Sequence, residues 1–136
     1  MLNSINRFAY SSNISFKGGP KIDKTSNMTS ALTQNAISEM KKRGELEMPE
    51  YGHFRAIMHL FDIPNSKNEA VFTIQHNLTA PKDQRSLTIG ARGLGHNQET
   101  YNVIKTGTKK EILKALDDLD LNSTIATIEK LSKNLD

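Results

Sequence analysis

The sequence contains no cysteine in its 136 residues. Disulfide bonds and thiolate metal sites are therefore excluded, and a metal site would need histidine and carboxylate ligands. No apolar stretch approaches the roughly 18 residues that a membrane-spanning helix needs. The first ten residues also lack the continuous apolar core of a secretory signal. By default, we expect a soluble, cytoplasmic protein without a membrane partner.

The chain also lacks a large excess of charge of either sign. The chain has 18 basic and 15 acidic residues, for a net charge of +3. The longest basic run is Lys41-Lys42-Arg43, and it is placed where the last turn of a helix favours cations. Gly44 follows, at the position where a left-handed helix end is common. Ordinary surface charge is therefore a better interpretation than a dedicated site for an anionic partner.

The length is typical of one domain. Residues 1–27 are rich in Ser and Asn, and their apolar residues occur singly and without a period. Such a segment buries too little area to offset its ordering entropy, so we predict a disordered N-terminal tail over 1–27. A short docking segment around residues 14–19 is the alternative. Residues 28–136 are then a single α+β domain.

Periodicity predicts a helix from about Thr29 to Arg43, followed by four strands. Turn residues separate the strands, and the connections are short enough for hairpins but not for parallel crossovers. We therefore predict a four-stranded antiparallel meander of order 1-2-3-4. The four segments are His53–Ile63, Ala70–Thr79, Ser86–Arg92 and Thr100–Lys105.

The C-terminal region is predicted to be helical and to pack on one face of the sheet. Thr108 and Glu111 have the spacing of a capping box, which marks a helix start. Asp117, Asp118 and Asp120 then interrupt the apolar stripe, and Asn122 or Ser123 would cap a second helix. One bent helix and a helix pair both remain open.

A register can be predicted from the apolar residues of the strands. Pairing Leu60 with Phe72 and Met58 with Ile74 closes the first hairpin. The next two hairpins close by pairing Leu78 with Leu87 and Ala91 with Tyr101. This register places every apolar set on one side, under the C-terminal helices. The residues expected to share that side include Met58, Ile74, Ile89 and Val103.

No motif in the sequence carries a recognisable chemistry, and we expect neither a cofactor nor a catalytic or metal site. In the predicted register, His76 lies on the apolar face and His59 on the other, so they cannot share a metal. The acidic residues Asp117, Asp118 and Asp120 lack EF-hand spacing and are explained by capping. The glycines of residues 90–95 end one strand and lead to another, whereas a phosphate loop leads into a helix.

The same register predicts a polar second face that solvent or a partner could reach. This face would present two arginines among amides and hydroxyls, with only Phe61 as an aromatic residue near its edge. Because single-stranded nucleic acid is usually bound on stacking aromatics, a protein partner is favoured. The residues of this candidate binding face are Arg55, His59, Thr73, Gln75, Asn77, Thr88, Arg92 and Asn102.

The sequence therefore favours a non-enzymatic protein-interaction module. It would use the open sheet face, or would pair through an edge strand with another protein or a second copy. Nucleic-acid binding through the same weakly basic face is the alternative. A small enzyme without a recognisable motif is the third hypothesis, and a pocket gathering a histidine with a carboxylate would indicate it.

Overall fold

The computed structural model describes residues 24–93 and 98–135 as three helices and one antiparallel sheet. The domain is α+β, as predicted, but the sheet has five strands because a two-residue strand precedes the four expected ones. The predicted N-terminal tail lies, for residues 1–23, outside this part of the chain. The elements in chain order are α2 (Lys24–Glu45), β1 (Glu50–Tyr51), β2 (Phe54–Asp62), β3 (Asn68–Asn77), β4 (Arg85–Gly93), β5 (Glu99–Gly107), α3 (Lys109–Asp117) and α4 (Leu121–Lys133).

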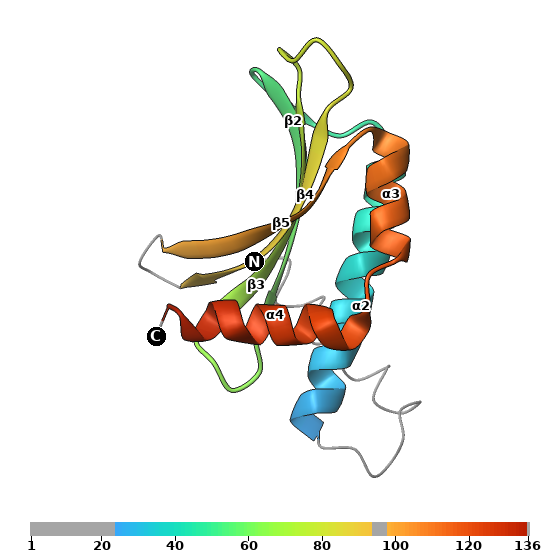
Figure 1. Cartoon of the computed structure of the whole chain (residues 1–136). Coiled ribbons are helices and arrows are strands. Elements are labelled where there is room, and N and C mark those ends of the chain that lie inside the picture. Colours follow the sequence, from blue (N-terminus) through green and yellow to red (C-terminus); the bar gives the residue numbers. More distant parts are fainter. Residues whose placement is uncertain (1–23, 94–97, 136) are drawn as a thin grey trace.

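The strands follow one another across the sheet in chain order, β1-β2-β3-β4-β5. Figure 1 shows the sheet strongly curved, with α2 and α3 alongside each other on one face and α4 crossing near its lower end. The hydrophobic core lies between this face and the helices. Its largest fully buried side chains include Met40, Phe61, Phe72, Ile74, Leu87, Ile89, Ile112, Leu116 and Ile128.

Helix α2 extends the predicted helix by five residues at its start and two at its end. The predicted apolar stripe is on the core side, since Leu32, Ala36 and Met40 are buried. Lys42 and Arg43 occupy the last turn, as expected from the helix dipole. Lys41 forms an ion pair with Asp117 and so links α2 to α3.

The C-terminal region is a pair of helices rather than one bent helix. The capping box at the start of α3 is confirmed: the Thr108 side chain accepts from the Glu111 amide, and the Glu111 carboxylate accepts from the Thr108 amide. The cap of α4 is Asp120, whose carboxylate accepts a 2.8 Å hydrogen bond from the Ser123 amide. The helix pair is therefore the one observed of the two alternatives that the sequence left open, and the cap is Asp120 instead of Asn122 or Ser123.

The predicted register is wrong in all three hairpins. In the β2–β3 hairpin, Ile57 rather than Met58 pairs with Ile74. In the β3–β4 hairpin, Leu87 pairs with Ile74 instead of Leu78, a shift of four residues that leaves the faces unchanged.

The third hairpin, β4–β5, is shifted by one residue. Ala91 pairs with Thr100 instead of Tyr101. A bulge between Leu87 and Thr88 changes the register again farther along β5. A one-residue shift moves side chains to the opposite face. The buried and open faces are therefore predicted correctly for β3 and β4. They are reversed for β2 and for the part of β5 that precedes the bulge.

Candidate functional site: the open face of the sheet

The face of the sheet that the described helices leave uncovered, here called the open face, can be derived from the strand pairs. Residues directly opposite each other in an antiparallel ladder have side chains on the same side. One row across β2 to β5 reads Leu60, Val71, Gly90 and Tyr101. The adjacent row reads Met58, Thr73, Thr88 and Val103. The centre of the open face is thus largely apolar, not polar as predicted.

Three large apolar side chains in these two rows are exposed. Met58 is 44% exposed, Tyr101 62% and Val103 56%, while Leu60 and Val71 beside them are buried. Isolated apolar residues are common on protein surfaces, but a group in adjacent rows is typical of interaction sites. We call these five residues the apolar patch.

Charged side chains form the next row along the strands. Asp62, Glu69, Arg92 and Glu99 lie opposite one another in turn. The guanidinium of Arg92 donates a 3.2 Å hydrogen bond to the Glu69 carboxylate, with which it forms an ion pair. Three carboxylates accompany one guanidinium, so this acidic row borders the apolar patch with negative charge.

The aromatic side chains on the open face are not the one that the sequence predicted there. Tyr51 pairs with Phe54 in the β1–β2 hairpin, and their ring centroids are 6.0 Å apart. Phe61, predicted near the edge of this face, is instead fully buried in the core with its ring 6.3 Å from that of Phe72. The one-residue register error in β2 explains why Phe61 lies in the core and not on the open face.

The eight predicted binding residues are divided between the two sides of the sheet. The partners of Arg55, His59 and Asn102 in the ladders are His76, Phe72 and Ile89, which place all three on the side covered by the helices. The open face keeps the other five. These are Thr73, Gln75, Asn77, Thr88 and Arg92.

Arg55 fixes the segment that leads from α2 into the sheet. Its guanidinium donates a 2.8 Å hydrogen bond to the carbonyl oxygen of Met48 and forms 3.2 Å ion pairs with Glu47 and Glu50. The side chain is therefore engaged within the domain. Its replacement would disturb the entry to β2 rather than report on partner binding.

His76 and Asp83 form a polar cluster at one end of the helix-covered side. The Nε2 atom of His76 lies 3.3 Å from the Asp83 carboxylate, which also accepts hydrogen bonds from Arg85 Nε at 2.8 Å and from the Lys109 amide at 3.2 Å. The cluster therefore joins β3, β4, their connecting loop and the start of α3.

Burial is the main cause that lowers the pKa of His76. The positive charges of Arg85 and Arg55 act in the same direction, while Asp83 opposes them. The hydrogen bond from Arg85 lowers the pKa of Asp83. Hydrogen bonds from Arg85 and Lys109 already engage this carboxylate, so the arrangement serves to connect elements. The prediction that His59 and His76 lie on opposite faces is wrong, because both are on the helix-covered side.

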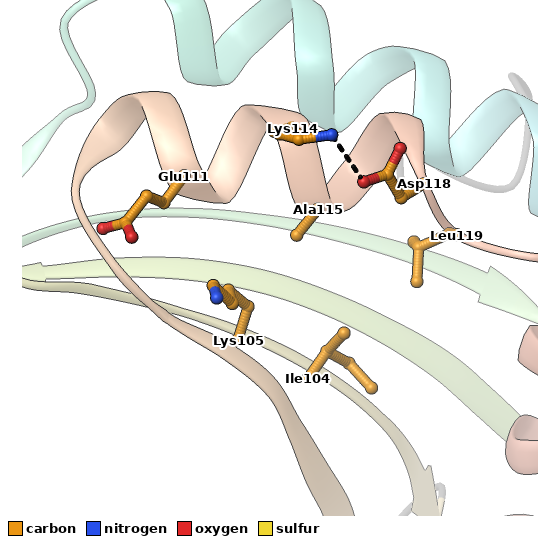
Figure 2. Close-up of a pocket in the computed structure, with 7 residues that line it drawn as sticks. All are labelled: Ile104, Lys105, Glu111, Lys114, Ala115, Asp118 and Leu119. Carbon is orange, nitrogen blue, oxygen red and sulfur yellow. Dashed lines mark hydrogen bonds and ion pairs between the residues drawn. The ribbon is translucent and has the colours of Figure 1, made fainter.

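A groove of about 510 Å³ runs between β5 and α3. Figure 2 shows Ala115 of α3 and Leu119, which lies just beyond the end of that helix, pointing toward Ile104 of β5. Lys105 and Glu111 lie at one end, and at the other Lys114 donates a 3.0 Å hydrogen bond to Asp118. Its charges are balanced, and it contains no histidine that could act on a substrate.

Within residues 24–93 and 98–135, no group of three or more His, Asp or Glu side chains is arranged to hold a metal ion. The acidic residues that the sequence singled out have structural partners: Asp117 pairs with Lys41, Asp118 with Lys114, and Asp120 caps α4. Gly90 and Gly93 belong to β4, and residues 94–97 lie outside the described part of the chain.

None of the helices described is both long and apolar enough to cross a membrane. Comparison with known proteins found no matching family, no similar curated protein and no similar solved structure. The open face of the sheet is therefore the strongest candidate for a functional surface in the described part of the chain.

Proposed function

We propose that this domain is a non-enzymatic protein-interaction module that binds a partner protein on its open face. The observation that carries the proposal is the apolar patch, where Met58, Tyr101 and Val103 are exposed in adjacent rows of one sheet. Burying such side chains against a partner contributes about 25 cal/mol for each Å² of apolar surface removed from water.

The acidic row defines the chemistry of the partner further. A matching surface would be apolar at its centre and carry Lys or Arg at the side that meets Asp62, Glu69 and Glu99. Complementary charges at the rim accelerate association and reject like-charged partners. Nucleic acid is disfavoured by the same row, because phosphate groups would approach three carboxylates and a guanidinium already paired with Glu69.

The test compares proteins captured by tagged forms of the full chain. Replacing Met58→Gln together with Val103→Thr removes apolar contacts from exposed positions, so stability should change by no more than about 0.5 kcal/mol for each substitution. The double variant should lose proteins that the natural chain retains. Leu46→Gln is the matched control, since Leu46 is a 65% exposed apolar residue that follows α2 and belongs to none of the strands.

Identical capture by the natural chain, the control and the double variant would contradict the open-face proposal. A second measurement addresses nucleic acid directly. Titration with generic RNA and DNA at two salt concentrations should show no binding that weakens steeply with salt. Such salt-dependent binding, unaffected by the Met58 and Val103 substitutions, would overturn the proposal in favour of a nucleic-acid partner.

A further inference from the structure

The open face, which the described helices leave uncovered, has a buried apolar centre. Figure 1 shows the sheet curving away from the helices, so the open face is on the inner side of the curve. Leu60 and Val71 are buried there, and Met58, Tyr101 and Val103 beside them are exposed. A short segment with a few large apolar side chains can cover a surface of this kind.

Residues 1–22 carry the whole excess charge of the chain. They contain Arg7, Lys17 and Lys21 and no acidic residue, whereas residues 23–136 contain equal numbers of basic and acidic residues. The acidic row of the open face has three carboxylates for one guanidinium. Charges attract over a Debye length of about 10 Å at 0.1 M ionic strength. The acidic row therefore favours the approach of this basic segment.

The same 22 residues also supply large apolar side chains. They contain three of the eight phenylalanine and tyrosine residues of the chain: Phe8, Tyr10 and Phe16. Segments that bind nothing are generally poor in aromatic residues. Ile14, Phe16 and Lys17 lie within four consecutive positions, so a short stretch combines apolar groups with a cation. This combination matches the partner chemistry that the open face defines.

The start of α2 places this segment within reach of the acidic row. In Figure 1, the first turn of α2 (blue) and the β2–β3 loop (green) both lie at the lower end of the domain. Asp62 ends β2 and Glu69 is the second residue of β3, so the acidic row flanks that loop. Lys17 precedes Lys24 by seven residues, which span up to about 25 Å when extended. Three strand spacings across the sheet amount to only about 14 Å.

We propose that residues 14–21 of the same chain bind the open face. Ile14 and Phe16 contact the apolar patch. Lys17 and Lys21 lie beside the acidic row. The groove between β5 and α3 is a weaker candidate, because its lysines and carboxylates are balanced and do not attract a basic segment. The bound segment covers the surface that a partner would use, so its regulatory effect rests on the proposed function.

Tethering makes even a weak contact sufficient. A segment joined to its site by a few residues is held at an effective concentration of about 1 mM. A contact with a dissociation constant of about 0.1 mM would then be formed about 90% of the time. Only about one chain in ten would have a free open face, and the apparent affinity for a partner would fall about ten-fold.

The first experiment detects the contact in the full chain by NMR. Because the chain has no cysteine, Ser12→Cys provides one thiol for a nitroxide label just before the proposed segment. The label should broaden the methyl signals of Met58 and Val103. The matched control is the same labelled chain with Ile14→Ser and Phe16→Ser, in which most of this broadening should be lost.

Two results of this experiment would overturn the proposal. Equal broadening of Met58 in the labelled chain and its control would show that the tether alone brings the label close. Broadening centred on Ala115 and Leu119 would place the segment in the groove beside α3 instead of on the open face.

The second experiment tests the acidic row in the same labelled chain. Glu99→Lys reverses one charge of the row and should reduce the broadening of Met58. Glu45→Lys is the matched control, because it makes the same change of charge at the last residue of α2, whereas the segment precedes the first. Raising the ionic strength should also weaken the contact. Equal effects of the two substitutions would reject the role of the acidic row.

The third experiment separates this inference from the proposed function. The full chain with Ile14→Ser and Phe16→Ser should capture a partner with an apparent affinity about ten-fold higher than that of the natural chain. A label contact without any captured partner would contradict the proposed function alone. Capture that is unchanged by the two substitutions, in a chain without the label contact, would contradict this inference alone.

Discussion

At the scale of single residues, Gly90 shows how closely β4 and β5 approach each other. A Cβ atom at this position would lie 2.5 Å from the carbonyl oxygen of Thr100 and 2.7 Å from the Cβ atom of Tyr101. Both values are below ordinary van der Waals contact, and one of the atoms belongs to the backbone. The glycine therefore permits the β4–β5 pairing that places Tyr101 on the open face.

Gly90→Ala should accordingly lower the free energy of unfolding by about 1–3 kcal/mol, the usual range for overpacking. Equilibrium denaturation in urea measures the loss. Gly93→Ala, on the same strand, is the control, because its Cβ atom would meet nothing closer than the Asn68 Oδ1 atom at 3.7 Å. Equal losses for the two variants would contradict a specific role for the close approach.

The register error also arises at the scale of residues. Strand β2 has apolar side chains on both faces: Ile57 and Phe61 are in the core, while Met58 and Leu60 lie on the open face. Alternation in such a sequence fits two registers that differ by one residue. The buried side was therefore ambiguous in β2, and the open face with its apolar patch could not be predicted.

At the scale of elements, the helix boundaries were predicted better than the strand pairings because caps depend on residues close in sequence. Thr108 and Glu111 bond across three positions. Strand pairing instead depends on residues far apart, and the bulge between Val103 and Lys105 left no mark in the alternation of β5. The same non-local dependence explains why Asn102 was assigned to the wrong side.

The cap of α4 gives a prediction for this element. Asp120→Ala removes the acceptor for the Ser123 amide and should lower the free energy of unfolding by about 0.5–2 kcal/mol. Asp120→Asn should cost only a few tenths of a kcal/mol, since asparagine caps about as well as aspartate. Thermal and urea unfolding of both variants provide the measurement, and an unchanged stability of the alanine variant would show that the cap contributes nothing.

At the scale of the whole molecule, the polar cluster makes stability depend on pH. The pKa of His76 is lowered by burial and by nearby Arg85 and Arg55, with Asp83 opposing them, so the folded state favours the neutral ring. The unfolded chain then binds more protons below its ordinary pKa of about 6.5. The stability contributed by neutral His76 is complete above that value and is lost as the pH falls through the lowered pKa.

Denaturation of the natural chain at pH 7.5 and at pH 5 should therefore give a lower free energy of unfolding at the acidic value. His76→Gln should reduce this difference between the two pH values. His53→Gln, which changes a histidine outside the cluster, serves as the control and should leave the difference unchanged. An equal effect of the two substitutions would assign the pH dependence to general charge and not to the cluster.

The order of the strands has a consequence for how the chain is made. Because each strand pairs with the one synthesised just before it, the sheet can grow hairpin by hairpin as the chain leaves the ribosome. Of the elements described, α2 is synthesised first, yet its apolar side packs on β2, α3 and α4, and the last of these ends at Lys133. Throughout most of translation, Ala36 and Met40 therefore lack their final neighbours, and transiently exposed apolar surface of this kind favours aggregation.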